Sequence, residues 1–512
     1  MANFDVIIVG GNTPALVCAS YLAKMAGLKV MIAERSNFVG GTAMTVEMKP
    51  GYKFHPAATG EYYVHPKINK DLELEKYGLE RIHCSPTLTT AFGDGNYLSL
   101  YYEVEKTQEE IARFSEKDAE TYGKWIQNYL KIGQLFGMAQ VNNAPEWPQF
   151  IGAMSGSQEM KVLMRDMLFG SAQDCLENAF ENDYVRAAFL TLMEGGTSGP
   201  SDIPFWFNIA RILSPWGFVK GGLVKVAESL EQCAVDNGVT IKRNCEVVKI
   251  LTKDNKAFGI RAKDGTEFTA KYGVISELEL PKTFNDLVGE DATLPEDFKK
   301  GIREIKYQCG GVTLNVALDA MPDFGFPEDR FGGFFGFAKP GFEYAEEAFA
   351  YYKCKKLPKH MMSMTYMPTY YEEPGTFAPK GHHILTGYAF PVNSVIEKPW
   401  REGGKELMLE RWIDSMDEFA PGLKDHVIYA DGYDPEELDK MFVMTNGDLG
   451  HGTLRWYGEL ANRPIPGYSN YVSPVKNLYM AGQNVHPLSG LGGVGGFNVA
   501  MAVLRDNGLL EK

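Results

Sequence analysis

The sequence predicts an α/β protein in which a domain built on a parallel sheet is assembled from separate stretches of the chain, completed by an α+β domain with a helical lid. Three observations predict this fold class. A strand, a glycine turn, a helix and a second strand occupy residues 4–34, a similar α/β pattern returns over 215–276, and a strand, a glycine-dense loop and a helix follow over 477–504. At 512 residues the chain suits two interleaved domains.

The N-terminal stretch carries this pattern most clearly. Residues 6–9 form an apolar run that predicts a buried strand, and Gly10-Gly11 follows where a tight turn must lead into a helix. Apolar residues at helical spacing predict that helix over 15–26, and another apolar run predicts a strand over 30–33. Two such strands joined by a helix form a βαβ unit.

A βαβ unit binds dinucleotides when glycines let backbone N–H groups approach a pyrophosphate and an acidic residue after the second strand binds a ribose hydroxyl. Glu34 stands 24 residues after Gly10, close to the separation that this chemistry needs. Where G-x-G-x-x-G is expected, Asn12 and Ala15 replace two glycines. Alanine is accepted at the third place, and we expect Asn12 to tolerate left-handed backbone. The sequence therefore predicts a Rossmann-type unit; the alternative is an ordinary α/β unit that binds nothing.

The segment after Glu34 supports the dinucleotide interpretation. Gly40-Gly41 follows this acidic residue at six and seven places, a spacing that resembles the flavoprotein extension of the Rossmann unit. Residues 51–60 then predict a strand followed by small residues, among them Ala57 and Ala58. Small side chains there would let the backbone approach a flat ring system, although a plain loop is the alternative.

Composition and charge exclude several classes of function. A net charge of −15 and a pI near 5.2 argue against a nucleic-acid partner and against broad adhesion to anionic lipid, since both need a basic surface. No signal peptide is evident, and no stretch approaches ~20 uninterrupted apolar residues. We expect a cytoplasmic protein with no transmembrane segment, for which peripheral membrane contact through a local patch stays open.

Cysteine and histidine usage bears on the redox compartment and on metals. The seven cysteines are scattered without a C-x-x-C pair, which indicates reduced thiols in a cytosolic protein and excludes a redox disulfide pair and a cysteine-based zinc cluster. The nine histidines are also dispersed, apart from His382-His383, and no H-E-x-x-H occurs. We therefore expect no metal.

The middle of the chain changes character twice. Residues 103–213 are mostly helical by their periodicity and rich in aromatic and methionine residues, which favours either a core or a lid over an apolar substrate. The pattern over 215–276 is expected to complete the first sheet. Strands predicted over 312–318 and 384–390, with a helix over 405–419, indicate an antiparallel sheet with α+β packing, which is usual for a substrate domain.

Two further stretches have a distinctive composition. Residues 361–371 are rich in methionine and tyrosine, so as a strand they would either line an apolar pocket with a few polar groups or form a plain core strand. The glycine-dense loop over 483–498 feeds a helix N-terminus, which predicts an anion site. In a flavoprotein such a site suits the pyrimidine edge of the flavin, where the helix dipole would stabilise negative charge.

These pieces match a known family in order and over nearly the whole chain. The matching stretches are residues 5–45, 51–56, 221–288, 420–423 and 445–500, and the most specific parts are Gly450-His451-Gly452, 463–468 and 481–498. The sequence resembles the phytoene/carotenoid desaturase-like branch of the FAD-dependent oxidoreductases with the amine-oxidase fold. We expect FAD-binding parts over 1–75, 215–285 and 468–512, a helical substrate or lid region over 76–214, and a substrate-domain sheet over 286–467.

The resemblance implies FAD as the cofactor. It places Glu34 on the adenosine ribose, the two glycine segments along the diphosphate, Val247 beside the adenine, and the C-terminal loop near the ribityl chain and flavin. The implied cofactor-binding residues are Gly10, Gly11, Asn12, Pro14, Ala15, Glu34, Arg35, Gly40, Gly41, Thr42, Ala57, Ala58, Val247, Gly482, Gln483, Gly493, Val494 and Asn498. His55 stands where an aspartate is common in the family.

The leading hypothesis for the reaction is desaturation or dehydrogenation of a C–C bond in an apolar, alicyclic or polyene substrate, with or without a carbonyl group. A hydride would pass to flavin N5 while a base or water takes the partner proton. His451 and His486 are candidates for that base, and Tyr366 and Tyr370 could polarise a substrate carbonyl. Both histidines could equally be structural.

Other functions stay open on the same resemblance. The fold also supports amine oxidation, saturation and polyene isomerisation. A non-catalytic lipid-binding carrier similar to the Rab GDP-dissociation inhibitors is a further alternative. Because no second dinucleotide unit with an acidic strand end is apparent, oxygen or a quinone-like compound is the expected electron acceptor.

Overall fold

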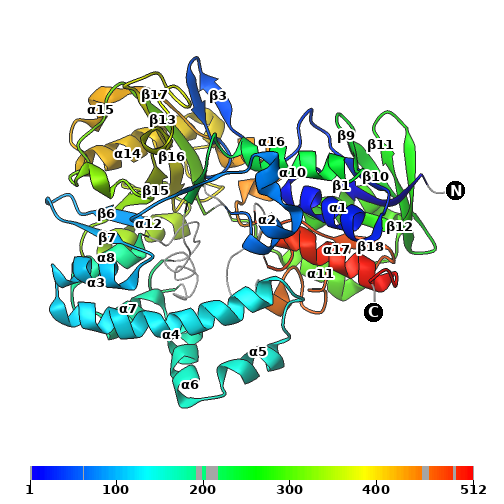
Figure 1. The fold of residues 1–512 in the computed structure, drawn as a ribbon, viewed down its shortest axis with the longest axis horizontal. Coiled ribbons are helices and arrows are strands. Elements are labelled where there is room, and N and C mark those ends of the chain that lie inside the picture. Colours follow the sequence, from blue (N-terminus) through cyan, green and yellow to red (C-terminus); the bar gives the residue numbers. More distant parts are fainter. Residues whose placement is uncertain are drawn as a thin grey trace.

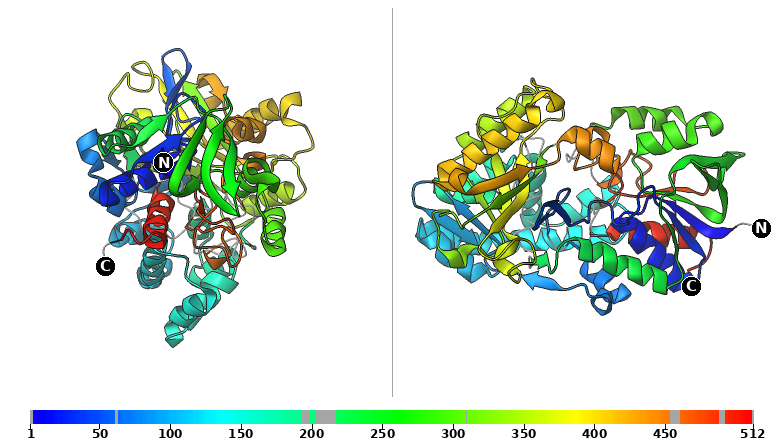
Figure 2. Two further views of the ribbon diagram at one scale, coloured as in Figure 1. Left: turned by 90° about the vertical axis from the view of Figure 1, so that its right-hand side faces the viewer. Right: turned by 90° about the horizontal axis from the view of Figure 1, so that it is seen from above.

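Two lobes, each built on a seven-stranded sheet, make up the part of the chain that the computed structural model describes (Figure 1). The described residues are 3–60, 63–191, 199–202, 217–308, 310–452, 460–487 and 492–510. Seen from above in Figure 2, the lobes lie side by side, and helix α16 (Pro435–Phe442, orange) lies between them.

The first sheet is parallel at its centre. Its parallel strands follow the order β18, β12, β1, β2, β9, and β10 and β11 form an antiparallel extension of β12. The strands are β1 (Phe4–Val9), β2 (Val30–Ala33), β9 (Thr240–Lys242), β10 (Val247–Lys253), β11 (Lys256–Ala262), β12 (Glu267–Ser276) and β18 (Leu478–Met480). They come from the beginning, middle and end of the sequence, so this sheet is discontinuous in the chain, as predicted.

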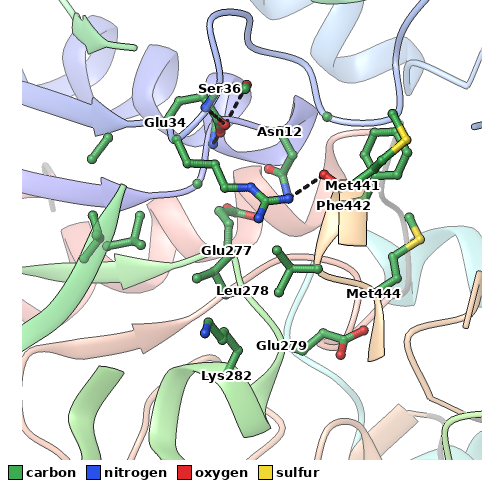
Figure 3. A pocket seen from close by; sticks show the side chains of 18 of the residues that line it. Asn12, Glu34, Ser36, Glu277, Leu278, Glu279, Lys282, Met441, Phe442 and Met444 are labelled. Atoms are coloured by element: carbon green, nitrogen blue, oxygen red, sulfur yellow. Dashed lines mark hydrogen bonds between the residues drawn. The ribbon is translucent and has the colours of Figure 1, made fainter. Parts of the chain in front are cut away.

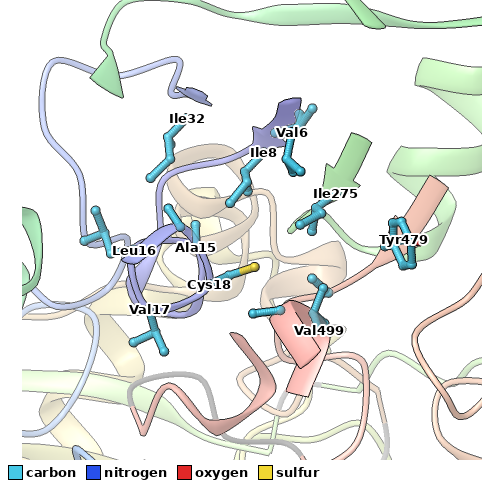
Figure 4. Close-up of a cluster of buried hydrophobic side chains, with 14 of the residues drawn as sticks. Val6, Ile8, Ala15, Leu16, Val17, Cys18, Ile32, Ile275, Tyr479 and Val499 are labelled. Carbon is cyan, nitrogen blue, oxygen red and sulfur yellow. The ribbon is translucent and has the colours of Figure 1, made fainter. Parts of the chain in front are cut away.

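Among the helices of this lobe are α1 (Thr13–Ala26), α10 (Val224–Asp236) and α17 (Val494–Asp506). Helix α1 contacts both of the others and ends at Gly27, whose φ of 61° is left-handed. Figure 4 shows Ala15 and Cys18 of α1 packed between Ile8 of β1 and Val499 of α17. All four of these side chains are fully buried, so α1 is held by apolar contacts on several sides.

The second sheet follows the order β17, β13, β16, β15, β14, β6, β7. Its strands are β6 (Leu88–Ala91), β7 (Tyr97–Leu100), β13 (Val312–Leu318), β14 (Phe334–Phe337), β15 (Met362–Tyr366), β16 (His383–Phe390) and β17 (Val427–Asp431). The predicted antiparallel pairing is found throughout, except that β6 and β14 are parallel. Helix α14 (Gly404–Phe419) packs in the core of this lobe through the fully buried Trp412.

A helical region joins the lobes. It comprises α3 (Val104–Ala112), α4 (Glu116–Gln140), α5 (Trp147–Met154), α6 (Gln158–Met164), α7 (Ala172–Ala179) and α8 (Asp183–Leu190). The long helix α4 runs across the lower part of Figure 1, above α5 and α6. Its C-terminal end reaches the first lobe, where His486 Nε2 donates to Ala139 O at 2.9 Å and Asn498 Nδ2 donates to Gln140 O at 2.8 Å.

The structure agrees with the sequence-based expectation in one place and differs in another. The helical stretch predicted over 103–213 begins at Val104, after β6 and β7, which join the distant second sheet. The strand expected over 361–371 ends at Tyr366, since Pro368 starts the short helix α13 (Pro368–Tyr371). Tyr370 therefore lies on a helix.

The remaining elements complete the two lobes. They are β3 (Val46–Lys49), β4 (Tyr52–Phe54), α2 (Pro66–Leu72), β5 (Arg81–His83), β8 (Gly217–Val219), η3 (Pro281–Val288), α11 (Glu296–Glu304), α12 (Glu343–Lys353) and α15 (Leu423–His426), with short single-turn segments between. Among the described helices, none combines the length and the apolar character needed to cross a bilayer.

The contact between α17 and α1 yields a stability prediction. A Cβ added to Gly496 of α17 would lie 2.1 Å from Pro14 O, a backbone atom that cannot move aside cheaply. Gly496→Ala should therefore lower the free energy of unfolding by about 1–3 kcal/mol, measured by urea denaturation. Gly137→Ala in α4 is the control: its Cβ would enter open space, so stability should rise by ~0.5–1 kcal/mol. Equal midpoints for Gly496→Ala and wild type would contradict this packing.

Candidate dinucleotide-binding site

A cavity of about 710 Å³ opens where the strands of the first sheet end beneath α16. Figure 3 shows side chains from the glycine turn after β1, from the segment after β2, from the segment after β12 and from the end of α16 around it. The carboxyl ends of parallel strands meet at one edge of a sheet, which is where such folds bind nucleotides. The volume lies within the range of cofactor pockets.

The glycine turn begins the cavity wall. Gly10 has a φ of +97°, a conformation that side chains disfavour. A Cβ on Gly11 would lie 2.9 Å from Val39 Cγ1, so this position has no room for a side chain. Asn12 does not use the left-handed backbone that asparagine tolerates: its φ is −75°, and it is the N-cap of α1, with Oδ1 accepting from Ala15 N at 3.0 Å.

Glu34 and Arg35 connect the turn to neighbouring segments. Glu34 Oε2 accepts from Gly11 N at 2.8 Å, and its Oε1 accepts from the N and Oγ of Ser36, both at 2.8 Å. The acidic residue after β2 thus stands directly against the glycine turn, as the motif requires. Arg35 instead donates from Nη2 to Met441 O at 2.5 Å, joining the first lobe to the end of α16.

The second glycine segment, Gly40-Gly41, packs closely against its neighbours and forms a further part of the cavity wall. Gly40 has a φ of +115°, and a Cβ there would lie 2.4 Å from Ala227 Cβ. A Cβ on Gly41 would lie 3.0 Å from Asn12 Cβ. The twelve residues predicted from the sequence that line the cavity are Gly10, Gly11, Asn12, Pro14, Glu34, Arg35, Gly40, Gly41, Thr42, Val247, His451 and Gln483.

Glu277, the residue after β12, is a cavity residue that the sequence reasoning missed. Its side chain is buried, and neither carboxyl oxygen has a hydrogen-bond partner among the described residues. Burial raises the pKa of Glu277 to about 8, although the nearby Asn12 side chain and Gly482 N–H partly offset the rise. Its position could have been inferred, because residues that follow parallel strands share one edge of the sheet.

His451 forms a pair with a second glutamate that the sequence reasoning missed. Its Nδ1 lies 2.9 Å from Glu279 Oε1, and Glu279 Oε2 accepts from Thr445 N at 3.0 Å. Because a carboxylate oxygen accepts, Nδ1 carries the proton and Nε2 is the basic atom. His451 lines both this cavity and a smaller one of about 170 Å³ beside Arg463.

The other predicted site residues lie outside the cavity lining. They are Ala15, Ala57, Ala58, Gly482, Gly493, Val494, Asn498, His486, Tyr366 and Tyr370. Asn498 and His486 hold the end of α4, and burial lowers the pKa of His486. Tyr370 packs its ring against Phe331 at 5.6 Å between centroids. Part of the predicted C-terminal loop, residues 488–491, falls outside the described residues.

Tyr366 forms a buried hydrogen-bonded cluster with His55. Leu223 N donates to His55 Nε2 at 3.1 Å, so the ring proton sits on Nδ1, which donates to Tyr366 Oη at 2.6 Å. Gly60 N also donates to Tyr366 Oη, at 2.5 Å. Burial lowers the pKa of His55 to about 3, so this imidazole stays neutral at ordinary pH.

Comparisons with known proteins agree with this geometry. A family model described as an NAD(P)-binding Rossmann-like domain matches residues 8–71. Pyridine nucleotide-disulfide oxidoreductase domain-containing protein 2 of Mus musculus is 26% identical over 550 aligned positions, covering 98% of this chain and 94% of that protein. 4,4'-Diaponeurosporene oxygenase of Staphylococcus aureus (strain USA300) is 22% identical over 503 positions, covering 95% of each. The resemblance to carotenoid desaturase-like oxidoreductases is confirmed.

Solved structures agree on the fold of this chain. An oxidoreductase from Methanosarcina mazei aligns with a TM-score of 0.63 and 16% identity over 98% of this chain and 100% of that one. A putrescine oxidase variant aligns with a TM-score of 0.60 and 16% identity over 98% of each. At this identity the likeness concerns the fold, and it confirms the predicted α/β class with its Rossmann-type domain.

The buried Glu277 makes stability depend on pH. Its folded pKa of about 8 lies above the ordinary value of 4.5, so the folded state keeps a proton that the unfolded state releases. The free energy of unfolding should therefore fall as pH rises from about 4.5 to 8, by up to ~1.4 kcal/mol per pH unit from this group. Glu277→Gln should remove that slope in urea denaturation, whereas Glu34→Gln should keep it. Equal slopes for wild type and Glu277→Gln would contradict the prediction.

Proposed function

We propose that the protein is an FAD-dependent oxidoreductase that desaturates or dehydrogenates a C–C bond of an apolar or alicyclic substrate. The cavity carries this proposal, because Glu34, the glycine turn and Gly40-Gly41 meet there as dinucleotide binding requires. The similarity along nearly the whole chain to a protein named as an oxygenase supports redox chemistry.

The residues present fit FAD. A diphosphate must lie close to backbone, and the glycine turn and Gly40-Gly41 line the cavity without side chains. Glu34 stands where an adenosine ribose would meet its carboxylate, and Val247 lines the cavity where an adenine would lie. The flavin would extend from the diphosphate toward Gln483, which also lines the cavity.

FAD, when bound, supplies the acceptor for a hydride from a substrate C–H bond. The chain would supply the group that takes the partner proton, and His451 Nε2 is the candidate that lines the cavity. Glu279 holds Nδ1 and would stabilise the imidazolium that forms when Nε2 accepts the proton. Oxygen or a quinone-like compound is the proposed final electron acceptor.

The visible absorption spectrum tests the cofactor directly. The purified protein should show flavin bands with about one FAD released per chain on denaturation. Glu34→Gln should weaken FAD binding by about tenfold, because a charged acceptor for the ribose hydroxyls becomes neutral. A colourless wild-type protein that takes up no added FAD would overturn the oxidoreductase proposal and favour a lipid-binding carrier.

His451 can be tested once a substrate bleaches the flavin in an anaerobic screen of alicyclic ketones and polyenes. His451→Ala should slow that bleaching by ~10²–10⁴-fold while FAD stays bound, because the proton acceptor is lost. His426→Ala is a matched control, since His426 Nδ1 also lies 2.9 Å from a carboxylate oxygen, that of Asp319, at an exposed site outside the cavity lining. Unchanged bleaching in His451→Ala would remove His451 from the mechanism.

A further inference from the structure

Glu277 lines the cavity, and its carboxyl group has no hydrogen-bond partner among the described residues. It lies between Gly10 and Gly482: a Cβ on Gly10 would lie 3.2 Å from its Cβ, and a Cβ on Gly482 would lie 3.5 Å from its Oε2. The side chain is only 7% exposed. Such a group in a native structure needs an explanation, and a bound ligand is one.

The first turn of α1 is short of free hydrogen-bond donors. In the first turn of α1, Pro14 has no N–H, and the N–H of Ala15 is taken by the Asn12 side chain. The N–H of Gly11, which precedes the helix, is taken by Glu34. Of the first three helical residues, only Thr13 can therefore offer its N–H to an anion. A ligand diphosphate, which has acceptor oxygens only, needs donors from elsewhere in this wall.

The charge of Glu277 decides whether its carboxyl group can donate a hydrogen bond to a diphosphate. An ionised carboxylate would repel a diphosphate at close range, whereas a neutral carboxyl has an O–H to donate. The surrounding titratable groups are Cys18 in α1, Glu34 and Arg35 after β2, Glu279 and Lys282 after β12, and His451 after α16. Burial, rather than any of their charges, is what raises the pKa of Glu277 to about 8.

We propose that Glu277 is a protonated ligand of the bound dinucleotide, its carboxyl O–H donating a hydrogen bond to a diphosphate oxygen. This inference rests on the proposed FAD binding and adds to it a residue role and a proton linkage. The acid replaces a donor that the first turn of α1 no longer offers. Its proton is held because both the buried site and the diphosphate disfavour the carboxylate.

The proposal makes cofactor affinity depend on pH in a defined direction. Below about pH 8 the free protein already carries the proton on Glu277, so cofactor binding does not change its protonation. Above about pH 8 the free protein has lost it, and binding must take one proton up. Affinity should then fall by up to about tenfold per pH unit, the limit for one linked proton.

Isothermal titration calorimetry of the apoprotein with FAD and with ADP-ribose tests this linkage. Each titration is run at pH 7 and pH 9 in two buffers of different ionisation enthalpy, which reports the protons taken up. At pH 9 the wild type should take up close to one proton with either ligand, since ADP-ribose shares the diphosphate and lacks the flavin. At pH 7 the uptake should be close to zero.

Three variants complete the design. Glu277→Gln keeps an N–H donor, so it should bind at pH 7 within a few-fold of wild type but show no proton uptake at pH 9. Glu277→Ala should bind at least tenfold more weakly at pH 7. Glu34→Gln, the matched change at the ribose carboxylate, should weaken binding yet keep the uptake. Thermal unfolding of each apoprotein reports whether the variant is folded.

The outcomes separate this inference from the proposed function. FAD binding by the wild type without proton uptake at pH 9, or with proton release, would overturn the role of Glu277 and leave the cofactor proposal intact. Uptake with FAD but none with ADP-ribose would overturn the contact to the diphosphate. Absence of FAD binding by folded wild type at both pH values would overturn the proposed function, and this inference with it.

Discussion

The hydrogen bond from Gly11 N–H to Glu34 Oε2 is the contact on which the candidate site depends. It joins the turn after β1 to the end of β2, and it forms only because no side chain separates Gly11 from Glu34. The Gly40 segment closes against Gly11 from the other side, with Gly40 N donating to Gly11 O at 2.6 Å. Three segments of backbone are thereby held at spacings that only glycine permits.

Local pattern was enough to predict the first βαβ unit. The strand over residues 30–33 and the second-sheet strand over 312–318 are found with the bounds expected. The first is a continuous apolar run, typical of a strand buried on both faces, and the second alternates apolar residues with Thr313 and Asn315. Glu34 was singled out by its distance along the chain from Gly10, and it lies against the glycine turn. The pattern did not reveal that Asn12 caps α1, because an asparagine before a helix can cap it as well as adopt left-handed backbone.

Features that depend on distant segments could not be predicted in the same way. The parallel pairing of β6 with β14 joins residues about 250 positions apart, and the sequence of neither strand identifies the other as its partner. Glu277 reads as an ordinary polar residue after a strand; its unusual state arises from burial by Gly10 and Gly482, which come from the two ends of the chain. The hydrogen bonding of Tyr366 likewise depends on His55, which is distant in the sequence.

Helix α4 gives the molecule a property that neither sheet has alone. It is rooted in the core of the second lobe through Tyr122 and Ile126, while its far end is held in the first lobe by His486 and Asn498. Because α4 is held in both lobes, it opposes a hinge motion that would move the lobes apart. A wide opening of the lobes would have to break the hydrogen bonds at Ala139 O and Gln140 O or bend α4.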